Sequence, residues 1–185
     1  MCAVIAMTTS DIATENRVVL FMDVHNFSIA LNASAGNLHS FLQEMYEGLG
    51  DIIVAHGGRI VKYLGDAMLC VFPAGCENEA VECSLRLRLA FSGLVSRRGL
   101  PPDTELEVGI GSGEMVTGVF GHRSLRHWDV FGPEVNRVAV IGHHRGVAIT
   151  QRVHDAVRMK HETRRLPDFK VKWQDEPLKV WEVVS

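Results

Sequence analysis

The chain has 185 residues, of which 46% are hydrophobic and 22% charged, a balance typical of one globular domain. This composition excludes a disordered protein, a collagen-like repeat and a coiled coil, and the formal net charge of −3 does not favour nucleic acid as a partner. The apolar runs are strand-sized, so no membrane helix is expected, and Met1–Met7 is too short for a signal peptide and has no basic flank. We therefore expect a cytoplasmic protein with no membrane partner.

The spacing of apolar residues predicts alternating strands and helices. In chain order these are a strand at Arg17–Val24, a helix at about Asn37–Ala55, strands at Arg59–Tyr63 and Ala67–Phe72, a helix at Glu77–Leu94, strands at Glu105–Ile110, Met115–Phe120 and about Trp128–Phe131, a helix from about Glu134, and a last strand at Val180–Val184. Two hairpins are predicted, one turning at Leu64–Asp66 and the other at Gly111–Glu114.

This order favours an α+β fold in which helices pack on one face of an antiparallel sheet, because it lacks the alternation of a parallel sheet. Gly111 and Gly113 are not a dinucleotide-binding motif, since they join two predicted strands and open no helix. With no linker or repeat in the sequence, we predict an N-terminal extension at residues 1–16 and one domain at residues 17–185.

Two aspartates are candidates for metal binding. Asp23 lies at the end of the first strand and Asp66 in the turn of the next hairpin, and carboxylates on rigid supports are how proteins hold hard cations. The alternative is that Asp66 only forms the turn and Asp23 only ends the strand. The segment Val24–Ser28 passes from a strand into a helix, where unsatisfied backbone N–H groups can bind phosphate. Together the three features suggest a nucleoside triphosphate site.

Other polar features of the sequence have simpler explanations. The four cysteines do not form a C-x-x-C pair, which makes a zinc or redox motif unexpected, and Cys70 reads as a core residue. The adjacent His143 and His144 would point in different directions, which argues against a shared metal site. The basic residues between Arg137 and Lys172 form either a solvated face or a phosphate-contacting patch.

Four segments resemble, in the right order, the signature motifs of class III nucleotide cyclases. They are Phe21–Ser28, which is similar to F-x-D-I-x-G-F-[ST]; Gly57–Asp66, similar to G-G-x-x-x-K-x-x-G-D; Gly109–Gly113, similar to G-I-x-x-G; and Trp128–Asn136, similar to Y-x-x-x-G-x-x-V-N. The resemblance extends from about residue 17 to the end of the chain.

This resemblance implies a ferredoxin-like α+β domain that works as a head-to-tail homodimer with shared active sites. It implies that the ribose 3′-oxygen attacks the α-phosphorus of the substrate and releases pyrophosphate, with two divalent ions, Mg²⁺ or Mn²⁺, as cofactors. Asp23, Asp66 and the carbonyl of Val24 match the metal ligands, and Asn136 matches the residue that positions the ribose. The implied phosphate-binding turn consists of Val24, His25, Asn26, Phe27 and Ser28.

Lys62 and Asp129 match the positions that read the base, and family members that use ATP carry Lys and Asp there, whereas users of GTP typically carry Glu and Cys. The chemistry agrees, because an ammonium donates to the ring nitrogen of adenine and a carboxylate accepts from its amine. The alternative is a surface lysine and a turn aspartate. We expect ATP as the substrate.

The sequence departs from the family at one catalytic position. An arginine expected four residues after Asn136, where it would stabilise charge in the transition state, is Val140 here. Arg137, His143 and Arg145 are candidate substitutes. Smaller departures are Asn26 in place of glycine and Ser28 in place of threonine, and either Lys170 or Lys172 matches a triphosphate-binding lysine.

The sequence therefore predicts an adenylate cyclase that forms cyclic AMP slowly. One alternative is a catalytically impaired nucleotide-binding regulatory domain on the same fold. Another is a guanylate or relaxed-specificity cyclase, against which Lys62 and Asp129 argue.

Overall fold

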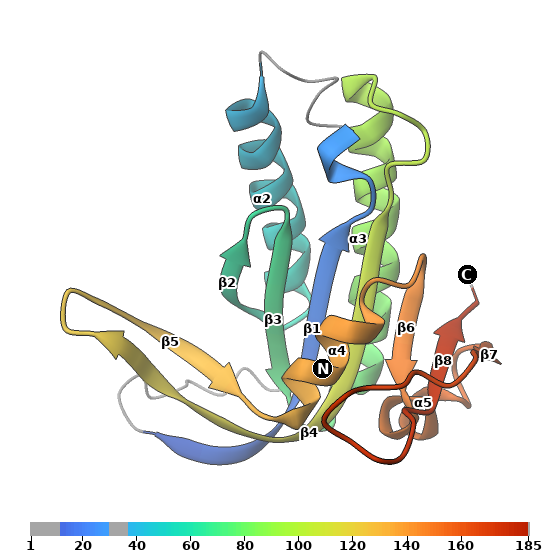
Figure 1. The fold of residues 1–185 in the computed structure, drawn as a ribbon. Coiled ribbons are helices and arrows are strands. Elements are labelled where there is room, and N and C mark those ends of the chain that lie inside the picture. The colour runs from blue at the N-terminus through green and yellow to red at the C-terminus, as the bar shows by residue number, and fades with distance from the viewer. Residues whose placement is uncertain (1–11, 30–36, 185) are drawn as a thin grey trace.

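The computed structural model describes residues 12–29 and 37–184 (Figure 1). Its elements are, in chain order, β1 (Ala13–Val24), α2 (Leu38–Ala55), β2 (Arg59–Leu64), β3 (Ala67–Pro73), α3 (Glu77–Arg98), β4 (Leu106–His122), β5 (Leu125–Phe131), α4 (Pro133–Ile141), β6 (Val147–Thr150), α5 (Gln151–Val157), β7 (Thr163–Arg165) and β8 (Val180–Val183). The apolar stretch Met1–Met7 lies outside the described residues. Within the described ranges, no helix is long and apolar enough to span a membrane.

The described strands form one sheet of eight, in which seven follow the order β2-β3-β1-β4-β6-β8-β7 and β5 pairs with β4. Every pairing is antiparallel except that between β4 and β6. This mostly antiparallel sheet with helices packed on it confirms the predicted α+β class.

The central strands are apolar on both faces. Along β1, Leu20 and Met22 pack in a core with residues of α2, α3 and α5, whereas Val19 and Phe21 pack on the opposite face with Val138 of α4. The prediction that helices cover one face is therefore incomplete, because α4 packs on the other. Helices α2 and α3 run side by side on the first face (Figure 1).

The hairpin predicted at Gly111–Glu114 is wrong, because β4 runs through this segment as one strand of 17 residues. The glycines serve a close approach instead of a turn. A Cβ added to Gly111 would lie 2.6 Å from Glu134 Oε2, and one added to Gly113 would lie 2.8 Å from Glu134 Cγ. Because these glycines have no Cβ, α4 can pack closely against the strand. The observed hairpin joins β4 to β5, with His122 opposite Leu125.

The first strand is longer than predicted. It begins at Ala13 rather than Arg17, because residues 13–16 pair with residues 114–117 of β4. Helix α3 likewise continues past Leu94 to Arg98, and Gly99 ends it in the left-handed conformation, with a φ of +63°. The remaining predicted helices and strands agree with the structure to within a few residues.

Candidate active site

The two predicted metal-binding aspartates meet at one end of the sheet. Asp23 is next to the last residue of β1, and Asp66 lies in the turn between β2 and β3, where Gly65 has a φ of +69°. Because β1 pairs with β3 so that Met22 is opposite Met68, Asp23 lies beside this turn. Burial raises the pKa of Asp66 to about 6, and the neighbouring Asp23 carboxylate adds to the rise.

The chemistry of these groups fits a hard divalent cation such as Mg²⁺ or Mn²⁺, which prefers oxygen ligands. The backbone N–H of Val24 lowers the pKa of Asp66, which puts Val24 at the same site. Among the described residues, no group of three or more His, Cys, Asp or Glu side chains could hold a metal by itself. A cation held by Asp23, Asp66 and the Val24 carbonyl would therefore keep positions open for phosphate oxygens.

The adjacent histidines face different acidic residues. His143 Nδ1 lies 3.2 Å from Asp23 Oδ2, whereas His144 Nε2 lies 3.7 Å from Glu182 Oε1. The two rings therefore face in different directions, as expected for adjacent residues. His143 instead adds a basic group beside Asp23, and its ring meets that of Phe21 edge to face, with 6.0 Å between the ring centroids.

The predicted phosphate-binding turn follows β1 directly. His25 N–H donates to the Glu105 carbonyl at 2.8 Å, and Asn26 has a φ of +60°, in the left-handed region. Phe27 stacks on Phe41 at 6.4 Å between ring centroids and packs against the core, so its side chain anchors the turn. Ser28 is exposed. The packing of Phe27 against the core thus supports the backbone of residues 25–28.

The two predicted base-reading residues are in contact. Lys62 Nζ of β2 donates to Asp129 Oδ2 of β5 at 2.7 Å, although 67 positions separate them in the chain. Asp129 is buried, and its Oδ1 accepts the Val130 N–H at 2.8 Å, which fixes the carboxylate. His127 Nε2 also lies 3.3 Å from Asp129 Oδ2. His127 was not among the predicted site residues, although its position two residues before Asp129 in a strand puts both on one face.

Asn136 is exposed on α4. Val140, one helical turn further on, is partly buried against the apolar cluster that includes Leu166, Leu178 and Val180. Val140 is therefore a packing residue, and it supplies no charge at the position where the resemblance predicts an arginine.

Each predicted substitute for that arginine already has a partner. Arg137 forms an ion pair with Glu134, and its Nε and Nη2 donate to Gln174 Oε1 at 3.3 and 3.0 Å. His143 is beside Asp23, and Arg145 pairs with Glu105. None of the three is a cation without a partner.

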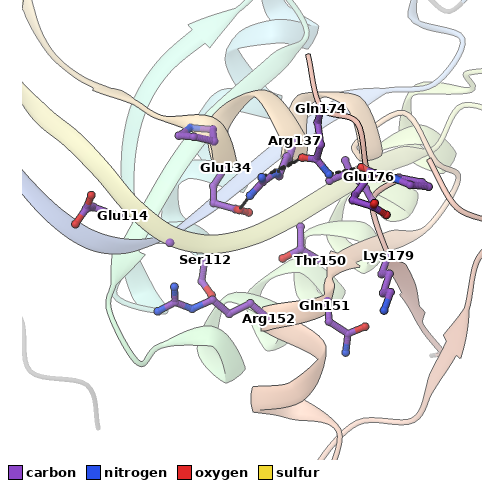
Figure 2. A pocket seen from close by; sticks show the side chains of 14 residues that line it. Ser112, Glu114, Glu134, Arg137, Thr150, Gln151, Arg152, Gln174, Glu176 and Lys179 are labelled. Carbon is purple, nitrogen blue, oxygen red and sulfur yellow. Dashed lines mark hydrogen bonds and ion pairs between the residues drawn. The ribbon is translucent and has the colours of Figure 1, made fainter. Parts of the chain in front are cut away.

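Arg137 belongs to a cavity of about 730 Å³ that does not include Asn136. Figure 2 shows Glu134, Arg137 and Gln174 joined across one wall of it. The cavity is lined by Ser112, Gly113, Glu114, Pro133, Glu134, Arg137, Thr150, Gln151, Arg152, Gln174, Glu176, Pro177, Leu178 and Lys179. Lys170 and Lys172, the predicted triphosphate-binding candidates, are exposed on either side of buried Val171 and do not line it.

Known proteins resemble this chain along most of its length. The family model described as the adenylate and guanylate cyclase catalytic domain matches residues 11–183. An adenylate cyclase of Anabaena cylindrica is 26% identical over 186 residues, which cover 92% of this chain and 37% of that protein. An adenylate cyclase of Mycobacterium tuberculosis H37Rv is 30% identical over 124 residues, or 64% of this chain and 27% of that protein. The chain thus spans about a third or less of these two relatives.

Solved structures of the same family share the fold. The adenylyl cyclase CyaB from P. aeruginosa superposes with a TM-score of 0.83 at 21% identity, covering 95% of this chain and 96% of that one. The guanylyl cyclase Cya2 superposes with a TM-score of 0.82 at 24% identity, covering 95% and 94%. Enzymes of both base specificities therefore have this architecture, so the fold alone does not identify the base.

Proposed function

Because the chain belongs to the adenylate and guanylate cyclase catalytic domain family, we propose that it converts ATP to 3′,5′-cyclic AMP and pyrophosphate. The contact between Lys62 and Asp129 is the observation that favours ATP over GTP as the substrate. An ammonium can donate to the ring-nitrogen acceptor of adenine, and a carboxylate can accept from its amine. Guanine has a carbonyl in place of that amine, and a carboxylate would repel it.

In this proposal Asp23, Asp66 and the Val24 carbonyl hold two divalent ions. When bound, the ions lower the pKa of the attacking ribose hydroxyl and neutralise phosphate charge. Backbone N–H groups of residues 26–28 bind phosphate oxygens, whereas that of His25 is used by the Glu105 carbonyl. Asn136 orients the ribose so that its 3′-oxygen faces the α-phosphorus. The convergence of Asp23 and Asp66 supports the first of these roles.

We also propose that the enzyme is a homodimer with shared sites. Large apolar side chains are exposed on β2 and on the β4–β5 hairpin, which projects from the body of the domain (Figure 1). They are Tyr63, Leu64, Val116, Leu125 and Phe131. A second copy that covered them would bring its own nucleotide-binding residues to the first, as the resemblance implies.

One observation favours a second function. Val140 packs in an apolar cluster, so the chain has no cation at the position that stabilises the transition state in the family. A domain of this kind could bind ATP, turn it over very slowly and act chiefly through nucleotide-dependent assembly. The retained Asp23 and Asp66 argue for catalysis, because nucleotide binding alone does not require both.

The test is to incubate the purified chain with ATP or GTP and with Mg²⁺ or Mn²⁺, and to measure the cyclic product. We expect cyclic AMP to exceed cyclic GMP. The double variant Lys62→Glu with Asp129→Cys should lower the ratio of cyclic AMP to cyclic GMP formed. Lys160→Glu, which changes an exposed lysine elsewhere, should leave this ratio unchanged. An unaltered ratio in the double variant would contradict the base assignment, and binding of ATP without product would favour the regulatory domain.

A further inference from the structure

The turn after β1 is tied at three points to the segment that leads into β4 and to the beginning of β4 itself. The first is the backbone bond from His25 N–H to the Glu105 carbonyl, at 2.8 Å. The second joins the His25 ring to Glu107, with 2.8 Å between Nδ1 and Oε1. The third joins Asn26 Nδ2 to Asp103 Oδ2 at 2.9 Å. The second and third contacts use the side chains of Glu107 and Asp103, and neither side chain has a role in the proposed reaction.

Asn26 needs such a contact more than its neighbours do. Among the described non-glycine residues it is the only one with a positive φ, +60°. Asparagine tolerates the left-handed region better than other side chains, but the conformation is still sparsely populated and persists only where the surroundings hold it. The bond to Asp103 spans 77 positions in the chain and holds the Asn26 side chain in place.

Glu107 supports the other half of the turn. It is directly opposite Asp23 in the β1–β4 ladder, and only 4% of its surface is exposed. A buried carboxylate is costly unless it accepts hydrogen bonds, and the His25 ring supplies one. Glu105, between the two acids, is already engaged by Arg88 and Arg145. Glu107, which lies in β4, is therefore the acid that holds the His25 ring in place.

We propose that Asp103 and Glu107 are positioning residues that hold the turn of residues 25–28 in the shape that receives nucleotide phosphates, acting through Asn26 and His25. The proposal rests on the proposed function, in which this turn binds the triphosphate. Backbone N–H groups bind phosphate well only when they are held close to the productive geometry. A turn held in this way strengthens binding in the ground state and the transition state alike, so its loss raises KM and leaves kcat nearly unchanged.

A double-mutant cycle between Asn26 and Asp103 tests the proposal. Asp103→Ala should raise KM for ATP about fivefold, the effect of one hydrogen bond of ordinary strength, with kcat within about twofold. Asp103→Asn, which keeps an acceptor, should restore most of the affinity. In an Asn26→Gly background, Asp103→Ala should change KM little, because glycine adopts the left-handed conformation without support. Asp51→Ala, on the exposed surface of α2, is the matched control and should not change KM.

Two further measurements separate this proposal from the proposed function. Amide hydrogen exchange of residues 25–29 in the nucleotide-free protein should become about fivefold faster in Asp103→Ala, and also in Glu107→Leu but less in Glu107→Gln. Affinity for a 3′-deoxy analogue of ATP, which cannot cyclise, should fall in parallel. These readouts do not need turnover, so they remain informative if the chain makes no cyclic AMP.

The proposal is overturned if Asp103→Ala raises KM equally in the native and Asn26→Gly backgrounds. It is also overturned if exchange of residues 25–29 is unchanged in the variants, or if kcat falls while KM and analogue affinity stay the same. The last result would mean that the two acids act on the reacting groups and not on the phosphate turn.

Discussion

Replacing Asp66 by asparagine should stabilise the protein when no metal is present. Burial raises the pKa of this carboxyl from 3.8 to about 6, so the folded chain holds the proton more tightly than the unfolded chain does. The stability that protonated Asp66 contributes is complete below about pH 4 and is lost as pH rises through about 6. Above that pH, ionised Asp66 favours unfolding relative to an uncharged side chain.

The size of the effect follows from the same shift. Each pKa unit corresponds to about 1.36 kcal/mol, which sets a ceiling of about 3 kcal/mol for this carboxyl. Asp66 is only partly buried, so solvent screening reduces the expected effect to about 1 kcal/mol. For a domain of this size, that corresponds to a rise of about 2–4 °C in Tm.

The assay is thermal unfolding in EDTA across pH 4 to 8, comparing the native chain, Asp66→Asn and the control Asp51→Asn, whose side chain is exposed on α2. Asp66→Asn should be the more stable protein at pH 8 and should match the native chain at pH 4. Millimolar Mn²⁺ should then stabilise the native chain more than the variant, since the ion uses the charge of Asp66. If Asp66→Asn melts below the native chain at pH 8 in EDTA, the carboxylate is stabilising and the reasoning is refuted.

Three further expectations concern the dimer, the transition state and the packing of α4. Mixing inactive Asp23→Ala with inactive Lys62→Ala should restore partial cyclase activity, because one composite site of the heterodimer is intact; no recovery in demonstrated heterodimers would contradict shared sites. Val140→Arg should raise kcat about tenfold or more with less change in KM, measured by steady-state kinetics, at some cost in Tm. Gly109→Ala should lower the free energy of unfolding in urea by about 1–3 kcal/mol, because its Cβ would lie 2.4 Å from the Val138 carbonyl oxygen; an unchanged midpoint would contradict this close packing.

The sequence predicted the elements whose signal is local. Apolar spacing gave α2 and α3, and Leu64–Asp66 gave the first hairpin, because helix periodicity and turn chemistry are read within a few residues. Gly111 and Gly113 were misread for the opposite reason. Their function depends on α4, which follows later in the chain, and a glycine that permits close packing is indistinguishable in sequence from one that permits a turn.

The site shows the same division. The convergence of Asp23 with Asp66 and of Lys62 with Asp129 follows from motifs that the chain shares with its family. The contacts made by Asp103, Glu107 and His143 could not be predicted, since they join residues that are distant in sequence through the pairing register of β1 and β4 and through the end of α4. These contacts belong to no motif.

The continuity of β4 also determines where the domain can accept extra residues. At about 3.3 Å per residue, a strand of 17 residues is about 56 Å long. It carries Glu107, which pairs with Asp23 of β1, and Gly118, which pairs with Asp129 of β5. Inserting or deleting one residue near Gly111 would turn every side chain beyond it to the opposite face. A loop would absorb such a change. In β4, the change would instead disrupt the register between the end of the sheet that carries Asp23, the proposed metal ligand, and the end that carries Asp129, the proposed base-reading residue.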